Sequence, residues 1–129
     1  IFSSVLPNLL VAGVANALRS SAAPKVMIAN LMTEPGETGD MSCEEQVSAL
    51  FDHVGPLLDA VVVPSSAPSK QAVRRYARCG SKPVAWSRDA LLGLGVIPLA
   101  ADLIRDGAKV RHHSGKLARC LLDLARVGL

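Results

Sequence analysis

Two short apolar runs bounded by prolines constrain the fold of this chain more than any other feature. The first covers residues 25–30 and follows Pro24, and the second covers residues 58–63 between Pro56 and Pro64. Neither run alternates strictly between apolar and polar residues. Continuous apolar runs of this length are typical of strands buried on both faces, as in a parallel sheet. We therefore predict two strands of a buried parallel sheet.

Helical patterns occupy the stretches between and after these runs. Ser42 and Glu45 have the spacing of a capping box, which predicts a helix that continues to about His53. Ser69 is the predicted N-cap of a helix through Cys79. The rest is predicted as a short strand at 83–86, a brief helix at 88–92, a strand at 96–99, a polar loop, and a helix from about Ser114. This alternation indicates βαβ crossovers in an α/β fold.

The beginning of the chain is predicted as one helix from Pro7 to about Arg19. Its residues are apolar almost all round, so we expect it to be buried, with partners on several sides. A doubly wound domain normally opens with a strand, a Gly-rich turn and a phosphate-binding helix, which this sequence lacks. The expected architecture is a layered, Rossmann-like parallel sheet flanked by helices, of which residues 1–129 hold only the C-terminal half.

Composition narrows the class of protein further. Half of the residues are apolar but only four are aromatic, which suits a layered α/β interior and excludes disorder. The longest apolar stretch, residues 5–18, is interrupted by Pro7 and Gly13 and is shorter than the roughly 20 residues of a membrane span. No secretory signal is visible. The three cysteines are far apart, so we expect free, buried thiols in a reducing compartment, which favours the cytoplasm.

The formal charge of +3 includes one cluster of cations on a predicted helix. Lys70, Arg74, Arg75 and Arg78 form this cluster. Because no aromatic residues are interleaved with them and no nucleic-acid motif is present, we interpret the cluster as a solvated helix face. Nucleic acid is not an expected partner.

Three groups of polar residues are candidates for ligand contact. Ser3, Ser4 and Asn8 stand at the entry to the first helix, where they either bind an anion or simply cap the helix. The segment 30–38 leaves the carboxyl end of a predicted strand and offers Asn30, Thr33, Glu37 and Thr38, either to a ligand or to an ordinary Pro-Gly turn.

The third group is Arg111-His112-His113 before the last helix. The planar guanidinium of Arg111 suits phosphate or carboxylate. Metal binding is not expected, because adjacent histidines diverge and no third ligand lies at a useful spacing. Glu34, Glu37 and Asp40 are either cation ligands or a solvated acidic loop. No nucleophile elbow, P-loop or zinc-binding helix motif is present, so catalytic residues remain unassigned.

Four segments resemble the CofD-like family, which contains the 2-phospho-L-lactate transferases and the bacterial gluconeogenesis factors. They are Ser3-Ser-Val-Leu-Pro-Asn-Leu-Leu-Val11, Ala23-Pro-Lys-Val26, Asn30-Leu-Met-Thr-Glu-Pro-Gly-Glu-Thr38, and Leu117-Ala118 after Arg111-His112. They occur in family order over nearly the whole chain, and the third is long and unusual. Followed by an amphipathic helix, it resembles the gluconeogenesis-factor branch more than the transferase branch.

The resemblance implies a cytoplasmic regulatory factor that binds UDP-type nucleotide-sugars and influences carbon metabolism and cell-envelope shape. It also implies a homodimer, a phosphate-contacting turn at Ser3, Ser4 and Asn8, and a cleft lined by Asn30, Thr33 and Glu37. The alternative is a transferase that moves a phospho-acyl group from a guanosine nucleotide to a deazaflavin with the help of Mg²⁺. A third hypothesis is an interaction module that seals against another chain.

Overall fold

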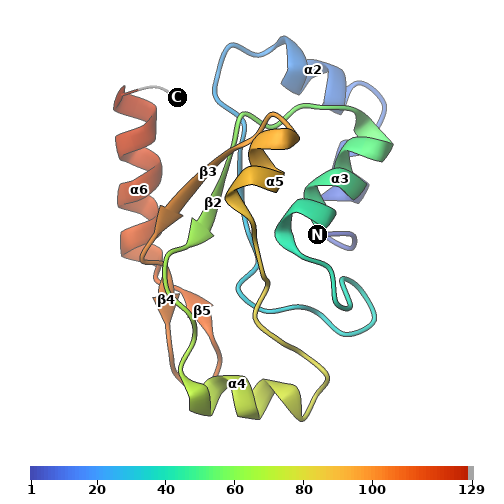
Figure 1. Cartoon of the computed structure of the whole chain (residues 1–129). Helices are drawn as coiled ribbons and strands as arrows, with labels where there is room; N and C mark the ends of the chain where they lie inside the picture. The colour runs from blue at the N-terminus through green and yellow to red at the C-terminus, as the bar shows by residue number, and fades with distance from the viewer. Residues whose placement is uncertain (128–129) are drawn as a thin grey trace.

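The computed structural model describes residues 1–127 and contains a three-stranded parallel sheet surrounded by helices (Figure 1). Strand β2 (Ala60–Pro64) lies in the centre, between β1 (Val26–Ile28) and β3 (Ile97–Ala101). The two apolar runs are therefore adjacent parallel strands, and the predicted layered α/β fold is confirmed.

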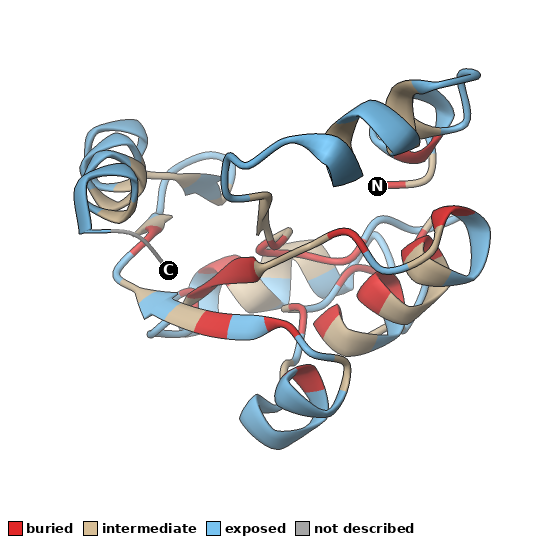
Figure 2. Cartoon of the chain, turned by 90° about the horizontal axis from the view of Figure 1, so that it is seen from above, coloured by how far each residue is buried: buried red, intermediate tan, exposed pale blue. Residues whose placement is uncertain are grey.

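Burial differs between the centre and the edges of the sheet. The four residues 60–63 of β2 have 0% exposed surface, as expected for a strand buried on both faces. The register places Ile28 and Leu99 on either side of Val62. Strand β1 is only half-buried and β3 exposes Ile97, because the helices cover these edge strands less completely (Figure 2). The expectation of burial on both faces is right for the second apolar run and wrong for the first.

Two helices pack against β2 in the core. Helix α3 (Cys43–Val54) begins with the predicted capping box, and α5 (Arg88–Gly93) is the predicted brief helix. Val47 of α3 and Leu91 of α5 pack in one apolar cluster with Val61. The helix patterns were readable because each has a polar N-cap followed by apolar residues on one side.

Two further predicted helices are present, with small shifts at their ends. Helix α4 (Lys70–Ala77) is capped by Ser69, whose hydroxyl accepts the Ala72 N–H at 3.2 Å. It ends two residues earlier than predicted. Helix α6 (Ser114–Val127) begins where predicted. Lys70, Arg74 and Arg78 are exposed, as expected of a solvated face.

The prediction of one buried helix at residues 7–19 is wrong. The segment contains two short helices, α1 (Leu6–Leu9) and α2 (Val14–Ser20), separated at Gly13, whose φ of 88° is left-handed. Only Leu6 of the two helices is buried, and Leu10 and Val11 between them are 56% and 58% exposed. A helix that is apolar on every side is buried only where other elements cover each side. This segment packs against the rest of the protein through one side only.

The predicted strand at 83–86 is also absent from the described residues. This stretch makes a single bridge, between Pro83 and Met32, because proline has no N–H to continue a ladder. Its other contacts are individual hydrogen bonds, such as that from the Trp86 indole to the Pro64 carbonyl at 3.2 Å. The segment is extended but belongs to no sheet.

The predicted polar loop before α6 contains a small hairpin. Strands β4 (Ile104–Arg105) and β5 (Arg111–His112) pair antiparallel, with Ile104 opposite His112 and Arg105 opposite Arg111. Two-residue strands leave too little periodicity to be read from sequence.

The cysteines are free, but only Cys43 is buried, whereas Cys79 is exposed and Cys120 is half-buried. The expectation of burial is thus wrong for two of the three, because Cys79 follows the end of α4 and α6 buries none of its residues. Within residues 1–127, no helix combines the length and apolar character that crossing a bilayer requires.

Candidate functional site

Three connecting segments meet at one end of the sheet. The loop at residues 30–38 follows β1, α4 follows β2, and the β4–β5 hairpin follows β3. The carboxyl ends of parallel strands lie at the same edge, so all three connections converge there (Figure 1). This is the edge at which open α/β sheets bind their ligands.

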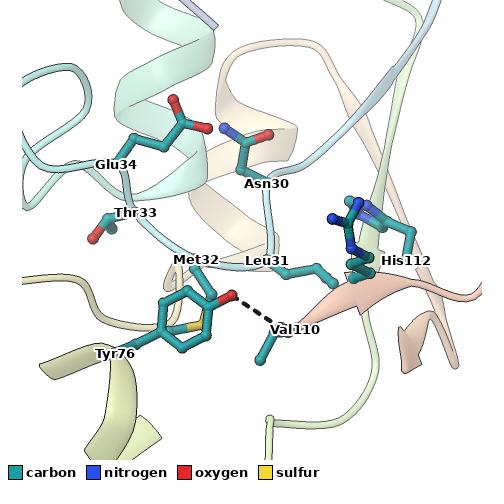
Figure 3. Close-up of a pocket in the computed structure, with 9 residues that line it drawn as sticks. Asn30, Leu31, Met32, Thr33, Glu34, Tyr76, Val110 and His112 are labelled. Atoms are coloured by element: carbon teal, nitrogen blue, oxygen red, sulfur yellow. Dashed lines mark hydrogen bonds between the residues drawn. The ribbon is translucent and has the colours of Figure 1, made fainter. Parts of the chain in front are cut away.

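A cavity of about 230 Å³ opens between these segments, and we call it the polar cavity. Its lining residues come from the loop, from α4 and from the hairpin: Asn30, Leu31, Met32, Thr33, Glu34, Tyr76, Val110, Arg111 and His112. Figure 3 shows the side chains of Asn30 and Glu34 at one end and that of His112 at another. The fold thus brings Arg111 to a loop some 80 residues earlier in the chain.

Two hydrogen bonds hold the walls of the polar cavity together. The Val110 N–H donates to the Tyr76 hydroxyl at 3.0 Å, which joins the hairpin to α4 (Figure 3). The His112 Nε2 donates to the Ala29 carbonyl at 3.0 Å, which joins the hairpin to the end of β1. Both bonds are partly buried, so we expect the cavity to be largely preformed.

Some polar groups that line this cavity already form hydrogen bonds within the protein, whereas others do not. The Thr33 hydroxyl accepts the Lys82 N–H at 3.1 Å, and the Thr33 carbonyl accepts the Ser81 hydroxyl at 2.6 Å. Arg111 is exposed and takes part in none of the ion pairs formed within residues 1–127. Thr33 is therefore a structural residue of the cavity wall. The guanidinium group of Arg111 is available to bind an anionic ligand through two hydrogen bonds.

Glu34 connects the polar cavity to a second polar group. A hydrogen bond with Glu37 is the main cause that raises the pKa of Glu34, and partial burial and the charge of Glu37 act in the same direction. The Glu34 N–H donates to the hydroxyl of the buried Thr38 at 2.8 Å, so Thr38 fixes the loop rather than facing a ligand.

The second polar group is a turn at residues 1–3 that surrounds the Glu37 carboxylate. Glu37 accepts the amino group of Ile1 at 2.5 Å, the N–H of Phe2 at 2.6 Å and the hydroxyl of Ser3 at 2.7 Å. The hydrogen bond from the amino group of Ile1 is the largest cause that lowers the pKa of Glu37, and the Ser3 hydroxyl is the next. A carboxylate thus lies where the sequence predicted an anion.

Ser4 and Asn8 form a self-contained turn beside this group. The Asn8 amide donates to the Ser4 carbonyl at 2.6 Å, and both side chains are exposed. The N-cap of α1 is Val5, without a side-chain cap, so neither serine caps this helix. None of Ser3, Ser4, Asn8 and Glu37 lines the polar cavity.

Tyr76 is the main lining residue that sequence reasoning missed. It is the one tyrosine of the chain and lies on the half-buried side of α4. A partly buried tyrosine usually has a partner for its hydroxyl, which is the signal that could have found it. The partner itself, the backbone of Val110, could not be read from sequence because it depends on the hairpin.

The family model for the 2-phospho-L-lactate transferase CofD matches residues 1–104. The chain is 33% identical over 125 residues to the gluconeogenesis factor of Halalkalibacterium halodurans and 32% identical over 133 residues to that of Bacillus subtilis. These matches cover 95% and 98% of this chain, but only 39% and 40% of the relatives.

The fold comparison agrees with the sequence comparison. A crystal structure of a Bacillus halodurans protein superposes with a TM-score of 0.90 at 32% identity, covering 94% of this chain and 40% of that one. The chain therefore spans about two fifths of the length of these relatives. Because the family model covers most of the chain and the relatives match along nearly all of it, the chain belongs to the CofD family.

Proposed function

We propose that the polar cavity contributes to the binding site of a UDP-type nucleotide-sugar in a cytoplasmic regulatory factor of carbon metabolism and cell-envelope morphogenesis. The gluconeogenesis-factor relatives support the metabolic part of this proposal. The observation that carries the binding part is the convergence of Asn30, Glu34 and Arg111 on one cavity at the carboxyl edge of the sheet.

The chemistry of the three side chains suits a sugar phosphate. The guanidinium of Arg111 can bind phosphate oxygens in a bidentate manner. The Asn30 amide and the Glu34 carboxylate supply donors and acceptors for hydroxyl groups. A volume of about 230 Å³ is smaller than typical whole-ligand pockets, so the cavity suits one part of a nucleotide-sugar.

The turn around Glu37 is a second element of the proposed site. Its donors, the Phe2 N–H and the Ser3 N–H and hydroxyl, are those that a phosphate would use. A phosphate there would have to displace the Glu37 carboxylate. In this proposal Ser3 contacts the ligand directly, and Ser4 and Asn8 hold the turn.

The test is titration of the chain with UDP-N-acetylglucosamine, observed by NMR because a partial site binds weakly. Arg111→Ala should weaken binding about tenfold or more, as expected for a lost charge-assisted contact. The matched control is Arg105→Ala, since Arg105 is the register partner of Arg111 but does not line the cavity. Equal effects of both variants, or no response of the cavity residues to the ligand, would refute the proposal.

The matching family model, that of a 2-phospho-L-lactate transferase, supports a second candidate, a transferase. The resemblance implies that such an enzyme uses a guanosine nucleotide and a deazaflavin. GDP in place of the UDP-sugar, with and without Mg²⁺, discriminates between the two. In the described part of the chain, no three His, Cys, Asp or Glu side chains converge into a metal site. The homodimer implied by the resemblance is tested separately, by light scattering.

A further inference from the structure

Charge is distributed very unevenly over this chain. Helix α4 with its caps and the β4–β5 hairpin, residues 69–78 and 104–112, carry seven of the 14 lysines and arginines but only one of the 11 acidic residues. These two segments therefore have a net charge of +6, and the remaining seven cations and ten acids give the rest of the chain −3. The two segments lie together at one end of the molecule (Figure 1), joined by the bonds from Arg75 and Val110.

Three of these cations form a row along the exposed side of α4. Lys70, Arg74 and Arg78 are spaced by four residues, so they follow one another about 6 Å apart along the helix axis. All three are exposed and take part in none of the ion pairs formed within residues 1–127. Together with Gln71 and Arg75 they line a concave surface of about 510 Å³, which we call the cationic groove.

The charges of this row act against the stability of α4 itself. Like charges four residues apart repel each other, and Lys70 stands in the first turn, at the positive end of the helix dipole. The helix contains no acidic residue that offsets these effects. Asp106 of the hairpin accepts the Ser69 N–H at 2.9 Å, which places its carboxylate at the start of the row and not along it. An arrangement that is locally unfavourable is expected where a surface serves binding.

The geometry of the groove favours an extended acidic peptide. In an extended strand, side chains on one face are about 6.6 Å apart, which is close to the spacing of the cations along α4. Carboxylates at alternate positions of such a peptide can therefore each meet one cation of the row. Arginine binds a carboxylate through two parallel hydrogen bonds, so two of the three pairs can be bidentate.

Other polyanions fit this surface less well. Helices that lie on an anionic bilayer insert large apolar side chains, and the exposed side chains of that kind in residues 1–127 all lie outside α4 and the hairpin. Single-stranded nucleic acid stacks its bases on aromatic rings. Tyr76, the one aromatic residue of α4, is half-buried, and the Arg75 guanidinium lies over its ring at 5.9 Å from the centroid.

We propose that the cationic groove binds an extended acidic segment of a partner protein, with its carboxylates at alternate positions opposite Lys70, Arg74 and Arg78. Arg75 donates to the Gly107 carbonyl at 2.8 Å and forms the fixed side of the groove. The cationic groove and the polar cavity share no lining residue, so this proposal is independent of the proposed nucleotide-sugar function.

The test is fluorescence polarisation of a labelled peptide of alternating Glu and Ser, titrated with the whole chain. Arg74→Glu combined with Arg78→Glu should weaken binding about tenfold or more, because two attractive pairs become repulsive. The matched control combines Arg119→Glu with Arg126→Glu, which changes the net charge equally at exposed positions of α6 outside the groove. Circular dichroism verifies that both double variants are folded.

A peptide of alternating Gln and Ser should not bind, and rising salt should weaken binding of the acidic peptide, since the cations are exposed. Equal weakening in the two double variants would mean that only the net charge matters, and would overturn the groove as a site. Absence of binding by the acidic peptide would overturn it as well. Tighter binding of phosphatidylserine vesicles or of oligothymidine than of the peptide would assign the row to another polyanion and refute the acidic partner.

Discussion

At the scale of single residues, Glu37 joins two segments that lie more than 30 residues apart. Its carboxylate accepts hydrogen bonds from the first three residues of the chain, including the Ser3 N–H at 3.2 Å. A carboxylate surrounded by several donors is stabilised in its charged form. The pKa of Glu37 is accordingly lowered in the folded chain, which ties this contact to stability.

The lowered pKa of Glu37 makes the free energy of unfolding depend on pH. A carboxyl whose pKa is lowered by folding stabilises the native state above its ordinary pKa of 4.5, and the contribution is lost as the pH falls below that value. Glu37→Gln should therefore lower the free energy of unfolding in urea at pH 7, and the difference from wild type should shrink at pH 3. Glu34→Gln is the matched control, because the pKa of Glu34 is raised and its replacement should cost nothing at pH 7. A loss for Glu37→Gln that persists unchanged at pH 3 would contradict the assignment.

At the scale of elements, α3 shows how local sequence fixes a helix start. The Ser42 hydroxyl accepts the Glu45 N–H at 3.3 Å, and the Glu45 carboxylate accepts the Ser42 N–H at 2.7 Å. Ser42→Ala removes one partner of this pair and should cost about 1 kcal/mol of unfolding free energy in urea. Ser48→Ala, in the same helix, should change it by less than about 0.5 kcal/mol, because alanine favours helices. Equal losses of unfolding free energy in the two variants would show that the Ser42 cap does not stabilise the helix.

Elements with strong local signals were predictable, and elements defined by distant partners were not. The capping box of α3 and the apolar run of β2 can each be recognised from a few consecutive residues of the sequence. Hairpin β4–β5 depends on pairing across a loop, and its contacts with Tyr76 and Ala29 appear only in the folded chain. For the same reason Asn30 and Arg111 were readable as candidates, whereas their meeting in one cavity was not.

At the scale of the whole molecule, the described residues have two apolar clusters of unequal role. One surrounds the sheet and includes Val61, Val63 and Leu91, all with 0% exposed surface. The other joins the first helices to α3 through Leu6 and Leu50. The polar cavity lies on connections that the first cluster holds in place, so we expect the geometry of the site to depend on the sheet core more than on residues 1–20.

Leu91 and Leu92 test whether α5 anchors the sheet core, because they are neighbours in α5 with opposite environments. Leu91 is fully buried against the sheet, whereas Leu92 is 45% exposed. Leu91→Ala should lower the global free energy of unfolding by about 2–5 kcal/mol, the usual cost of a core cavity. Leu92→Ala should change it by less than about 0.5 kcal/mol. Urea denaturation measures both, and comparable losses for the two variants would mean that α5 does not anchor the core as the structure indicates.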